Sequence, residues 1–202
     1  MPLPPLPETN HPLVKPLLQM SDPDLVDLFQ QHSDQGKYFV AIFCRYASIV
    51  YALAHAATKS PVQSDYLFAK TWSAIHHEMR LMDARVVLEH MSLQAWLVNV
   101  TGVTINNLKL PNVEEIHYSL HQTSPVLWCY LNQALNLLPG DLRLILLLSQ
   151  TFRWSPMRIA AYLQAEGDLV SETEIRYRLA EGYAHLQSNL PQDIQEIYLA
   201  RA

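Results

Sequence analysis

Apolar residues recur every three or four positions along most of this chain, which is the period of a helix with one buried face. This pattern predicts an all-α protein with long helices in the N-terminal half and shorter ones in the C-terminal half. One long helical stretch is expected to be interrupted near Met91–Ser92. The predicted helices cover residues 21–31, 38–57, 59–82, 84–108, 127–137, 140–151, 155–165 and 172–188.

The segments between these helices predict a division into two helical domains. Residues 1–20 are rich in proline and are expected to form a flexible or polyproline arm. Residues 109–126 are polar, contain two prolines and show little periodicity, so they are expected to be a linker. The predicted organisation is an arm over 1–20, a helical bundle over 21–108, a linker over 109–126, a second helical domain over 127–190 and a C-terminal tail over 191–202.

Composition supports the helical prediction and narrows the class of protein. Half of the residues are hydrophobic and only five are glycine, which fits a helical protein better than a turn-rich β protein. Cys44 and Cys129 both lie in apolar runs, so we expect free thiols in a reducing compartment, the cytoplasm. The N-terminal segment lacks a basic region, and polar residues interrupt every apolar stretch. Neither a signal peptide nor a membrane span is therefore expected.

The segment "VSETEIRYRLAEGYAHLQ" (170–187) has two conflicting features. Ser171 followed by Glu174 is a capping-box signature for a helix start, and apolar residues behind it fall on one stripe. The residues beside that stripe suit DNA contact, but three acidic residues on the same helix would repel phosphates. The stripe holds Ile175, Leu179, Tyr183 and Leu186; the outward residues are Arg176, Tyr177 and Arg178; the acids are Glu172, Glu174 and Glu181. The alternative to a DNA-reading face is a solvated face with an Arg176–Glu172 pair.

Six segments, in order, resemble motifs of one protein family. They are "FVAIFCRYASIVYALA" (39–54), "QSDYLFAKTW" (63–72), "SLQAWL" (92–97), "ALNLLPGDLRLILLL" (134–148), "SPMRIAAYL" (155–163) and "VSETEIRYRL" (170–179). Together they resemble the small two-domain sigma-70 factors of the extracytoplasmic-function type, over about residues 22–190. In that family the first three motifs belong to domain two, and the last three to domain four with its helix-turn-helix.

The resemblance implies a sigma factor that binds bacterial RNA polymerase core and directs it to promoters, without catalysis or a cofactor. The domain-two-like bundle would bind polymerase and the −10 element, and the domain-four-like helix-turn-helix would read the −35 element. Polymerase core and promoter DNA are the implied partners, and an anti-sigma factor is a further one that the family allows. The implied polymerase-binding residues are Asp65, Tyr66, Phe68 and Trp72, and the implied DNA-binding residues are Ser171, Thr173, Arg176, Tyr177, Arg178, Arg158, Trp96, Asn99 and Asn107.

The sequence departs from the family where DNA is read. The Arg, Asn and Asp that usually follow Trp96–Leu97 are missing, Arg158 replaces a usual Glu, and the turn before Val170 is longer. Residues 131–190 carry five arginines against six acids, so this domain lacks the basic surface of a strong DNA binder. These departures favour an alternative function, a sigma-fold adaptor that binds polymerase or another regulator without reading promoter DNA.

Other motifs give little support for an enzyme or a metal protein. His76, His77 and Glu78 are consecutive and do not share one helix face, as metal ligands of the H-E-x-x-H type do. The five glycines are scattered and form no phosphate-binding loop or nucleophile elbow. No catalytic residue is therefore predicted.

Overall fold

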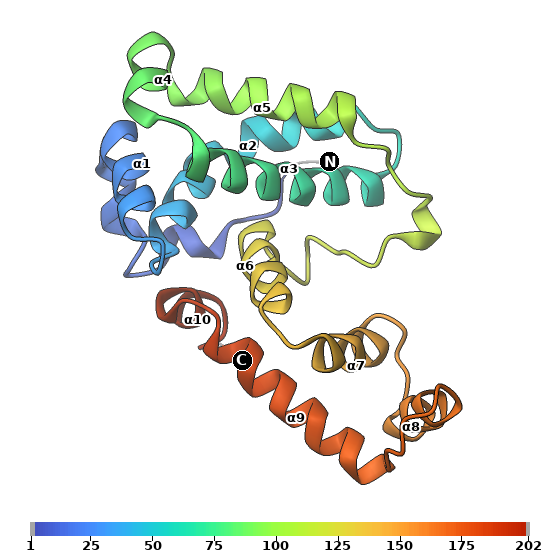
Figure 1. The fold of residues 1–202 in the computed structure, drawn as a ribbon. Helices are drawn as coiled ribbons and strands as arrows, with labels where there is room; N and C mark the ends of the chain where they lie inside the picture. The colour runs from blue at the N-terminus through green and yellow to red at the C-terminus, as the bar shows by residue number, and fades with distance from the viewer. Residues whose placement is uncertain (1–2, 201–202) are drawn as a thin grey trace. The chain divides into compact units, whose positions relative to one another are not determined.

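The computed structural model describes residues 3–200, and all regular structure in that range is helical (Figure 1). The predicted all-α class is thus confirmed. Met1, Pro2, Arg201 and Ala202, the outermost residues of the predicted arm and tail, lie outside the described residues. Contacts divide the chain into two compact units: unit 1 is residues 1–129 with 191–202, and unit 2 is residues 130–190.

The helices follow the predicted ones closely, with short additions at both ends of the chain and one in the predicted linker. Short 3₁₀ helices are labelled η and α-helices α. Their bounds are η1 Pro7–Asn10, η2 Lys15–Gln19, α1 Asp22–Gln31, α2 Lys37–Ala56, α3 Pro61–Leu81, α4 Ala84–His90, α5 Leu93–Asn107, η3 Val113–Glu115, α6 Pro125–Asn136, α7 Gly140–Gln150, α8 Pro156–Ala165, α9 Glu172–Ser188 and α10 Gln192–Tyr198.

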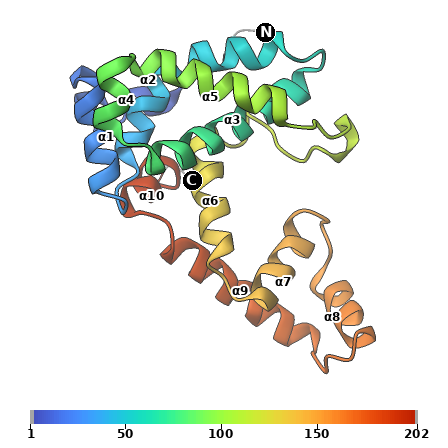
Figure 2. The ribbon, with the colours of Figure 1, turned by 45° about the horizontal axis from the view of Figure 1, so that its top comes forward.

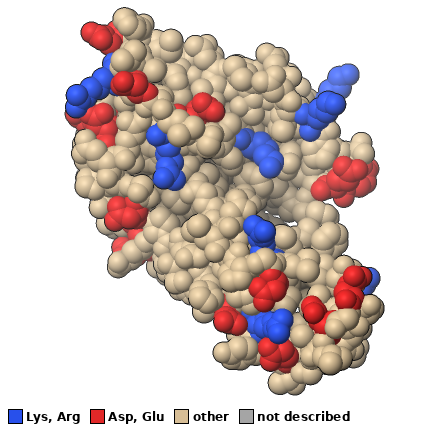
Figure 3. Space-filling model, in the orientation of Figure 1, with Lys and Arg blue, Asp and Glu red and all other residues tan. Residues whose placement is uncertain are grey.

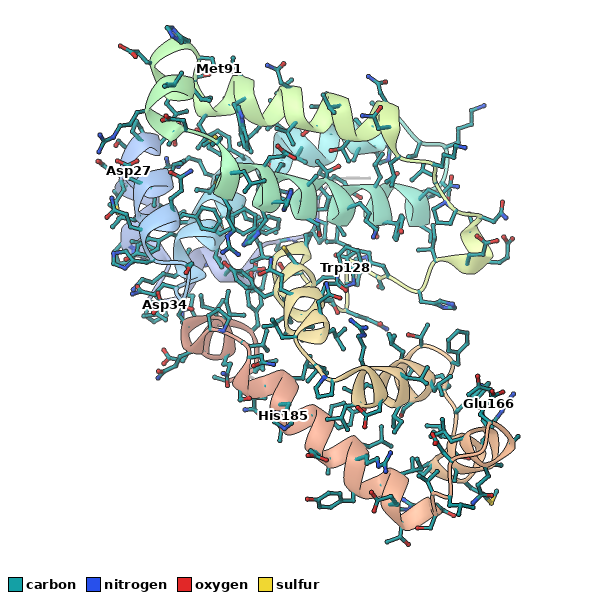
Figure 4. The ribbon with its side chains drawn as sticks, in the orientation of Figure 1. Asp27, Asp34, Met91, Trp128, Glu166 and His185 are labelled. Carbon is teal, nitrogen blue, oxygen red and sulfur yellow. The ribbon has the colours of Figure 1, made fainter. Side chains whose placement is uncertain are left out.

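Polar side chains set several of the helix starts that the sequence predicts. The interruption near Met91 is one case, because α4 ends at His90 and Ser92 begins α5 (Figure 4). Ser92 Oγ accepts a hydrogen bond from the backbone N–H of Ala95 at 3.2 Å, and Asp83 caps α4 in the same way through Val86. Each cap satisfies a backbone donor that a helix start leaves without a partner.

An aromatic cluster forms the core of unit 1, where α2 packs against α1, α3 and α5. Phe39 and Phe43 of α2 meet Trp72 of α3 edge to face, with ring centroids 5.8 and 4.9 Å apart. Phe68 of α3 joins the cluster through Phe43. Phe68 and Trp72 are completely buried. The expectation that these two bind polymerase is therefore wrong, because their surface is used by the core.

Helix α2 is also long and apolar enough to cross a membrane by length and composition alone. Half of the apolar window is buried inside the structure, as in the core helix of a folded domain. This single helix is weak evidence for a membrane span.

The predicted flexible arm is instead folded onto α2. Residues 7–19 form η1 and η2, both of which pack on α2, and Val14 is completely buried. Arg45 of α2 fixes the end of the arm by donating to the carbonyls of Leu18 at 3.1 Å and Met20 at 2.8 Å. The arginine also forms an ion pair with Asp22 at the start of α1. Arg45 therefore pairs within unit 1, where it binds the arm and the start of α1. The composition of the arm alone could not predict these contacts.

The predicted linker and tail also belong to unit 1. In the linker, Leu120 is buried and Gln63 of α3 donates to the carbonyl of Pro111 at 3.0 Å. In the tail, residues 192–198 form α10, which buries Ile194 and Ile197. The boundary between the units falls inside α6, after Cys129.

Unit 2 is built around the three helices α7, α8 and α9, which all pack against one another. Its core joins Ile145 of α7, Ile159 and Leu163 of α8 and Ile175 of α9. Val170, in the connection between α8 and α9, is buried in the same cluster. Helices α8 and α9 and the turn between them, called the helix-turn-helix below, thus pack together, and α7 packs against both helices.

Candidate nucleic-acid interface

The connection from α8 to α9 is an ordered turn, although it is longer than an ordinary helix-turn-helix turn of three or four residues. Helix α8 ends near Glu166 (Figure 4), and Gly167 takes a φ of +102°, which favours glycine. The N–H of Gly167 donates to Gln164 O at 3.1 Å and that of Asp168 to Leu163 O at 2.9 Å. This pair of bonds is a Schellman motif, which closes the end of α8.

A side chain then braces the second half of the turn. Gln164 Nε2 donates to the carbonyl of Val170 at 2.6 Å, so α8 holds the chain where it enters α9. Because Val170 is also buried, the extra residues leave the start of α9 in a fixed position relative to α8.

Ser171 caps α9 as the sequence predicts. Its Oγ accepts a hydrogen bond from the backbone N–H of Glu174 at 3.2 Å. The Glu174 carboxylate instead accepts from Arg178 Nε at 2.9 Å. Only the serine half of the predicted capping box therefore forms, and Ser171 is occupied in stabilising the helix.

The outward face of α9 carries the other residues predicted to read DNA. Thr173 is exposed, Tyr177 is 66% exposed and the Arg176 side chain is 64% exposed, whereas the Arg178 side chain is only 28% exposed. Arg176 Nη2 lies 2.5 Å from Glu172 Oε1, so the i,i+4 pair expected for a solvated face does form. The structure brings Thr173, Arg176 and Tyr177 to one exposed end of the helix.

Acidic partners reduce the positive charge of this face. Arg176 pairs with Glu172 and Arg178 pairs with Glu174, each across one helical turn. Figure 3 shows the same mixture, with basic and acidic side chains side by side over α8 and α9. A phosphate would have to compete with a carboxylate for each guanidinium, which weakens sequence-independent binding.

Arg158 lies at the start of α8, beside aromatic residues that the sequence reading did not single out. Its guanidinium carbon is 4.3 Å from the centre of the Trp154 ring, and Trp154 meets Tyr162 edge to face at 5.6 Å. A stacked guanidinium keeps most of its N–H donors available. In the sequence, only Trp154, four residues before Arg158 and just outside a predicted helix, indicated that an aromatic ring packs against this arginine.

A separate candidate surface in unit 1 is a groove of about 520 Å³ along α3 and α5, which run side by side (Figure 2). Trp96 lines the groove and is 9% exposed, so most of its side chain is buried and only a small part faces the groove. Asn99 and Asn107, both exposed, line it on the same face of α5. The groove thus gathers the three residues of unit 1 that were predicted to contact DNA. Glu78 of α3 also lines it and was not predicted.

The predicted polymerase-binding residues do not form one exposed surface. Besides the buried Phe68 and Trp72, Asp65 accepts a hydrogen bond from the Tyr51 hydroxyl at 3.2 Å, and burial raises the pKa of its carboxyl. Tyr66 packs against Trp128 with ring centroids 6.4 Å apart. Both residues therefore hold neighbouring segments of unit 1. They are half-buried, so their predicted contact with polymerase stays a prediction, whereas Phe68 and Trp72 have no exposed surface for it.

No protein-family model matches this sequence, and no curated protein matches it. Function is therefore inferred from the helix-turn-helix of unit 2 and the groove of unit 1. These two surfaces contain all of the residues predicted to bind DNA, although Ser171 contributes through its cap.

Proposed function

We propose that this chain is a sigma-like factor that binds bacterial RNA polymerase core in the cytoplasm and directs promoter-specific initiation. The observation that carries the proposal is the helix-turn-helix of unit 2, in which α9 presents Thr173, Arg176 and Tyr177 at its exposed N-terminal end. DNA-reading helices place their contacts at that end. The six motif resemblances, in order along the chain, support the same function.

The charge of α9 limits how such a factor could work. With Glu172 and Glu174 paired to its two arginines, the helix has little net attraction for phosphates. We therefore propose that polymerase supplies most of the affinity for DNA, and that α9 contributes selectivity once it is held against the promoter. The Arg176 guanidinium still has donors for a guanine edge.

The same ion pairs favour a second candidate function, a sigma-fold adaptor. In this alternative, the chain binds polymerase or another regulator. The Arg–Glu pairs then lie on a solvated helix face that does not contact DNA. The adaptor differs from the sigma-like factor in one measurable respect: its α9 surface makes no contribution to transcription from a promoter.

Transcription in vitro with core polymerase and a fragmented genomic template tests the proposal. The Arg176→Ala/Arg178→Ala variant should lose promoter-dependent transcripts while it still binds core polymerase. The expected loss in specific DNA binding is on the order of 2–6 kcal/mol, counting roughly 1–3 for each good base contact. Lys59→Ala/Arg85→Ala, which removes the same charge from exposed positions in unit 1, is the matched control.

The outcomes separate the two functions. Lost transcripts with intact core binding, and normal transcripts from the control variant, support the sigma-like factor. Transcription that is unchanged in the α9 variant supports the adaptor. Absence of core binding by the parent chain contradicts the sigma-like factor, and it leaves only an adaptor that binds another regulator.

A further inference from the structure

The chain between α7 and α8 carries aromatic rings that duplex reading by α9 does not use. Phe152 is 60% exposed, and Tyr162 of α8 is 40% exposed. The Trp154 ring contacts both of them, with centroids 6.2 Å from Phe152 and 5.6 Å from Tyr162. Trp154 also packs against the core of unit 2, which anchors the group. These three residues, called the aromatic corner below, form an exposed apolar surface of the kind that marks binding sites.

Two exposed arginines without an acidic partner accompany the rings. Arg153 lies between Phe152 and Trp154 in the sequence, and the Arg158 guanidinium carbon lies 4.3 Å from the centre of the Trp154 ring. Unlike the arginines of α9, these two take part in none of the ion pairs among the described residues. Residues 151–165 contain both arginines and no acidic residue. The aromatic corner therefore carries positive charge that is free to attract an anion.

Arg153 occupies a strained backbone position at this corner. Its φ is +55°, and no other non-glycine residue of the described range has a positive φ. The conformation turns the chain from α7 toward α8, and the N–H of Trp154 donates to the carbonyl of Leu148 at 3.1 Å. Glycine or asparagine adopts this backbone at lower cost. The turn itself therefore does not call for an arginine, whereas a use for its charge does.

Exposed rings combined with unpaired guanidinium groups suit single-stranded nucleic acid. Unpaired bases stack on aromatic rings and on guanidinium planes, while cations bind the phosphates. In a duplex the neighbouring base pairs cover the faces of each base, so the rings have nothing flat to contact. An acidic peptide would pair with the arginines, but it offers the exposed rings no matching flat partner.

We propose that the aromatic corner and its two arginines bind single-stranded nucleic acid. Bases stack on Phe152 and Tyr162, and Trp154 holds these rings on the core of unit 2. Phosphates accept hydrogen bonds from Arg153 and Arg158. This binding needs no polymerase, so it holds or fails separately from the proposed function.

Fluorescence anisotropy of labelled oligonucleotides, titrated at low salt with the full chain, tests the proposal. Single-stranded DNA and RNA of one mixed sequence, about twelve nucleotides long, are compared with the DNA duplex of that sequence. At least one single strand should bind at least about fivefold more tightly than the duplex, as expected when one base gains a stacking partner. Charge alone would favour the duplex, because its phosphates are more densely spaced.

Two leucine variants test the stacking. Phe152→Leu and Tyr162→Leu keep an apolar side chain and remove the flat ring, so each should weaken binding of the single strand by at least about fivefold. Tyr183→Leu is the matched control, because Tyr183 lies on α9 and its exposed fraction of 42% is close to the 40% of Tyr162.

Arg153→Asn tests the charge, since asparagine tolerates the left-handed backbone. The salt dependence of binding should become shallower by about 0.7 units of slope for one lost phosphate contact. The thermal unfolding midpoint should stay the same or rise, because the backbone strain is relieved. Lys59→Asn, at an exposed position of unit 1, is the control for the same change in charge.

The comparison of single strand with duplex uses the unaltered chain, so it does not depend on the folding of a variant. Equal binding of the two overturns the proposal, as does single-strand binding that neither leucine variant weakens. An equal loss in Tyr183→Leu and Tyr162→Leu overturns it as well. A glutamate-rich peptide of the same charge that binds more tightly than either single strand would identify an acidic protein as the partner instead.

Discussion

The Asp193 carboxylate in α10 caps the N-terminus of α2, accepting from the backbone N–H of Lys37 at 2.8 Å and from that of Gly36 at 3.0 Å. The residue at the cap position, Gly36, has no side chain that could do so. A residue more than 150 positions away thus supplies the acceptor that most helices obtain locally. The negative charge also suits the positive end of the helix dipole.

Asp193→Ala should destabilise unit 1 by about 1–2 kcal/mol, because two backbone donors at the start of α2 lose their acceptor and the dipole loses its charge. Asp193→Asn should cost less, since it keeps one oxygen. Urea unfolding followed by circular dichroism measures the change. Glu196→Ala, on the exposed side of α10, should have little effect; an equal loss in both variants would point to α10 packing instead of capping.

Glu172→Gln/Glu174→Gln should strengthen nonspecific binding of DNA by unit 2, because each change frees an arginine from an acidic partner. Gel-shift titrations at several salt concentrations should show tighter binding and a steeper salt dependence, by about one unit of slope for each additional phosphate that α9 neutralises. Asp141→Asn/Glu166→Gln changes the same charge elsewhere in unit 2. If this control strengthens binding equally, net charge and not the freed arginines is responsible.

The two helical glycines Gly102 and Gly182 should respond in opposite ways to alanine. A Cβ on Gly102 in α5 meets nothing within 4 Å, so Gly102→Ala should stabilise by about 0.5–1 kcal/mol through helix propensity. A Cβ on Gly182 in α9 would lie 3.0 Å from Leu146 Cδ1 and 3.2 Å from its Cγ. Since Leu146 is buried, Gly182→Ala should destabilise by about 1 kcal/mol. Thermal unfolding midpoints of the two variants test both expectations. A rise for both variants would mean that Leu146 and α7 move to make room for the Cβ of residue 182.

Stability should fall as the pH drops below 6.5, because His76 is buried between Phe29 and Phe39. Burial, with smaller contributions from the charges of Arg80 and His77, lowers the pKa of His76 to about 3 from an ordinary 6.5. Between these values the unfolded chain binds a proton that the folded chain does not. The free energy of unfolding should therefore decrease by at most about 1.4 kcal/mol per pH unit.

Urea unfolding at pH 7 and pH 5 checks this dependence. His76→Gln should remove about 2 kcal/mol of the difference between the two pH values, whatever its effect on absolute stability. His77→Gln changes an exposed residue and should keep the parent's difference. A His76→Gln difference equal to the parent's would assign the acid sensitivity to other groups.

Cys44 should react slowly with iodoacetamide in the folded chain. Burial raises the pKa of its thiol to about 12, and the charge of Glu8 adds to the rise. Relative to an ordinary value of 9.0, the reactive thiolate at pH 8 should be lower by roughly a thousandfold. Peptide mass spectrometry after timed alkylation measures it, with urea-unfolded protein as the fast reference. Labelling as fast as in urea would mean that the segment over Cys44 opens readily.

The helices could be predicted from the sequence because their signals are local. Ser92 and Ser171 mark the starts of α5 and α9 by capping, and apolar periodicity fixes their buried faces. The outward position of Arg176 and Tyr177 follows from the same periodicity, as does the Arg176–Glu172 pair. What depends on a few neighbouring residues could thus be predicted without the structure.

The incorrect predictions concern contacts between distant residues. Prolines in residues 1–20 suggested an extended arm, but Arg45 binds the carbonyls of Leu18 and Met20 and holds the segment on α2. Helix α10 is short, and the backbone groups that its Asp193 caps at the start of α2 lie far away in the sequence. Phe68 and Trp72 lie on the buried face of α3, and motif resemblance offered no means of separating core aromatics from exposed ones.

The cap supplied by Asp193 has a consequence for synthesis on the ribosome. The chain emerges from its N-terminus, so α2 is made early, whereas Asp193 follows the whole of unit 2. The first turn of α2 therefore stays uncapped until more than 150 further residues have been translated. Unit 2 has all of its residues earlier, since residues 130–190 are contiguous, and it can fold while unit 1 is still incomplete.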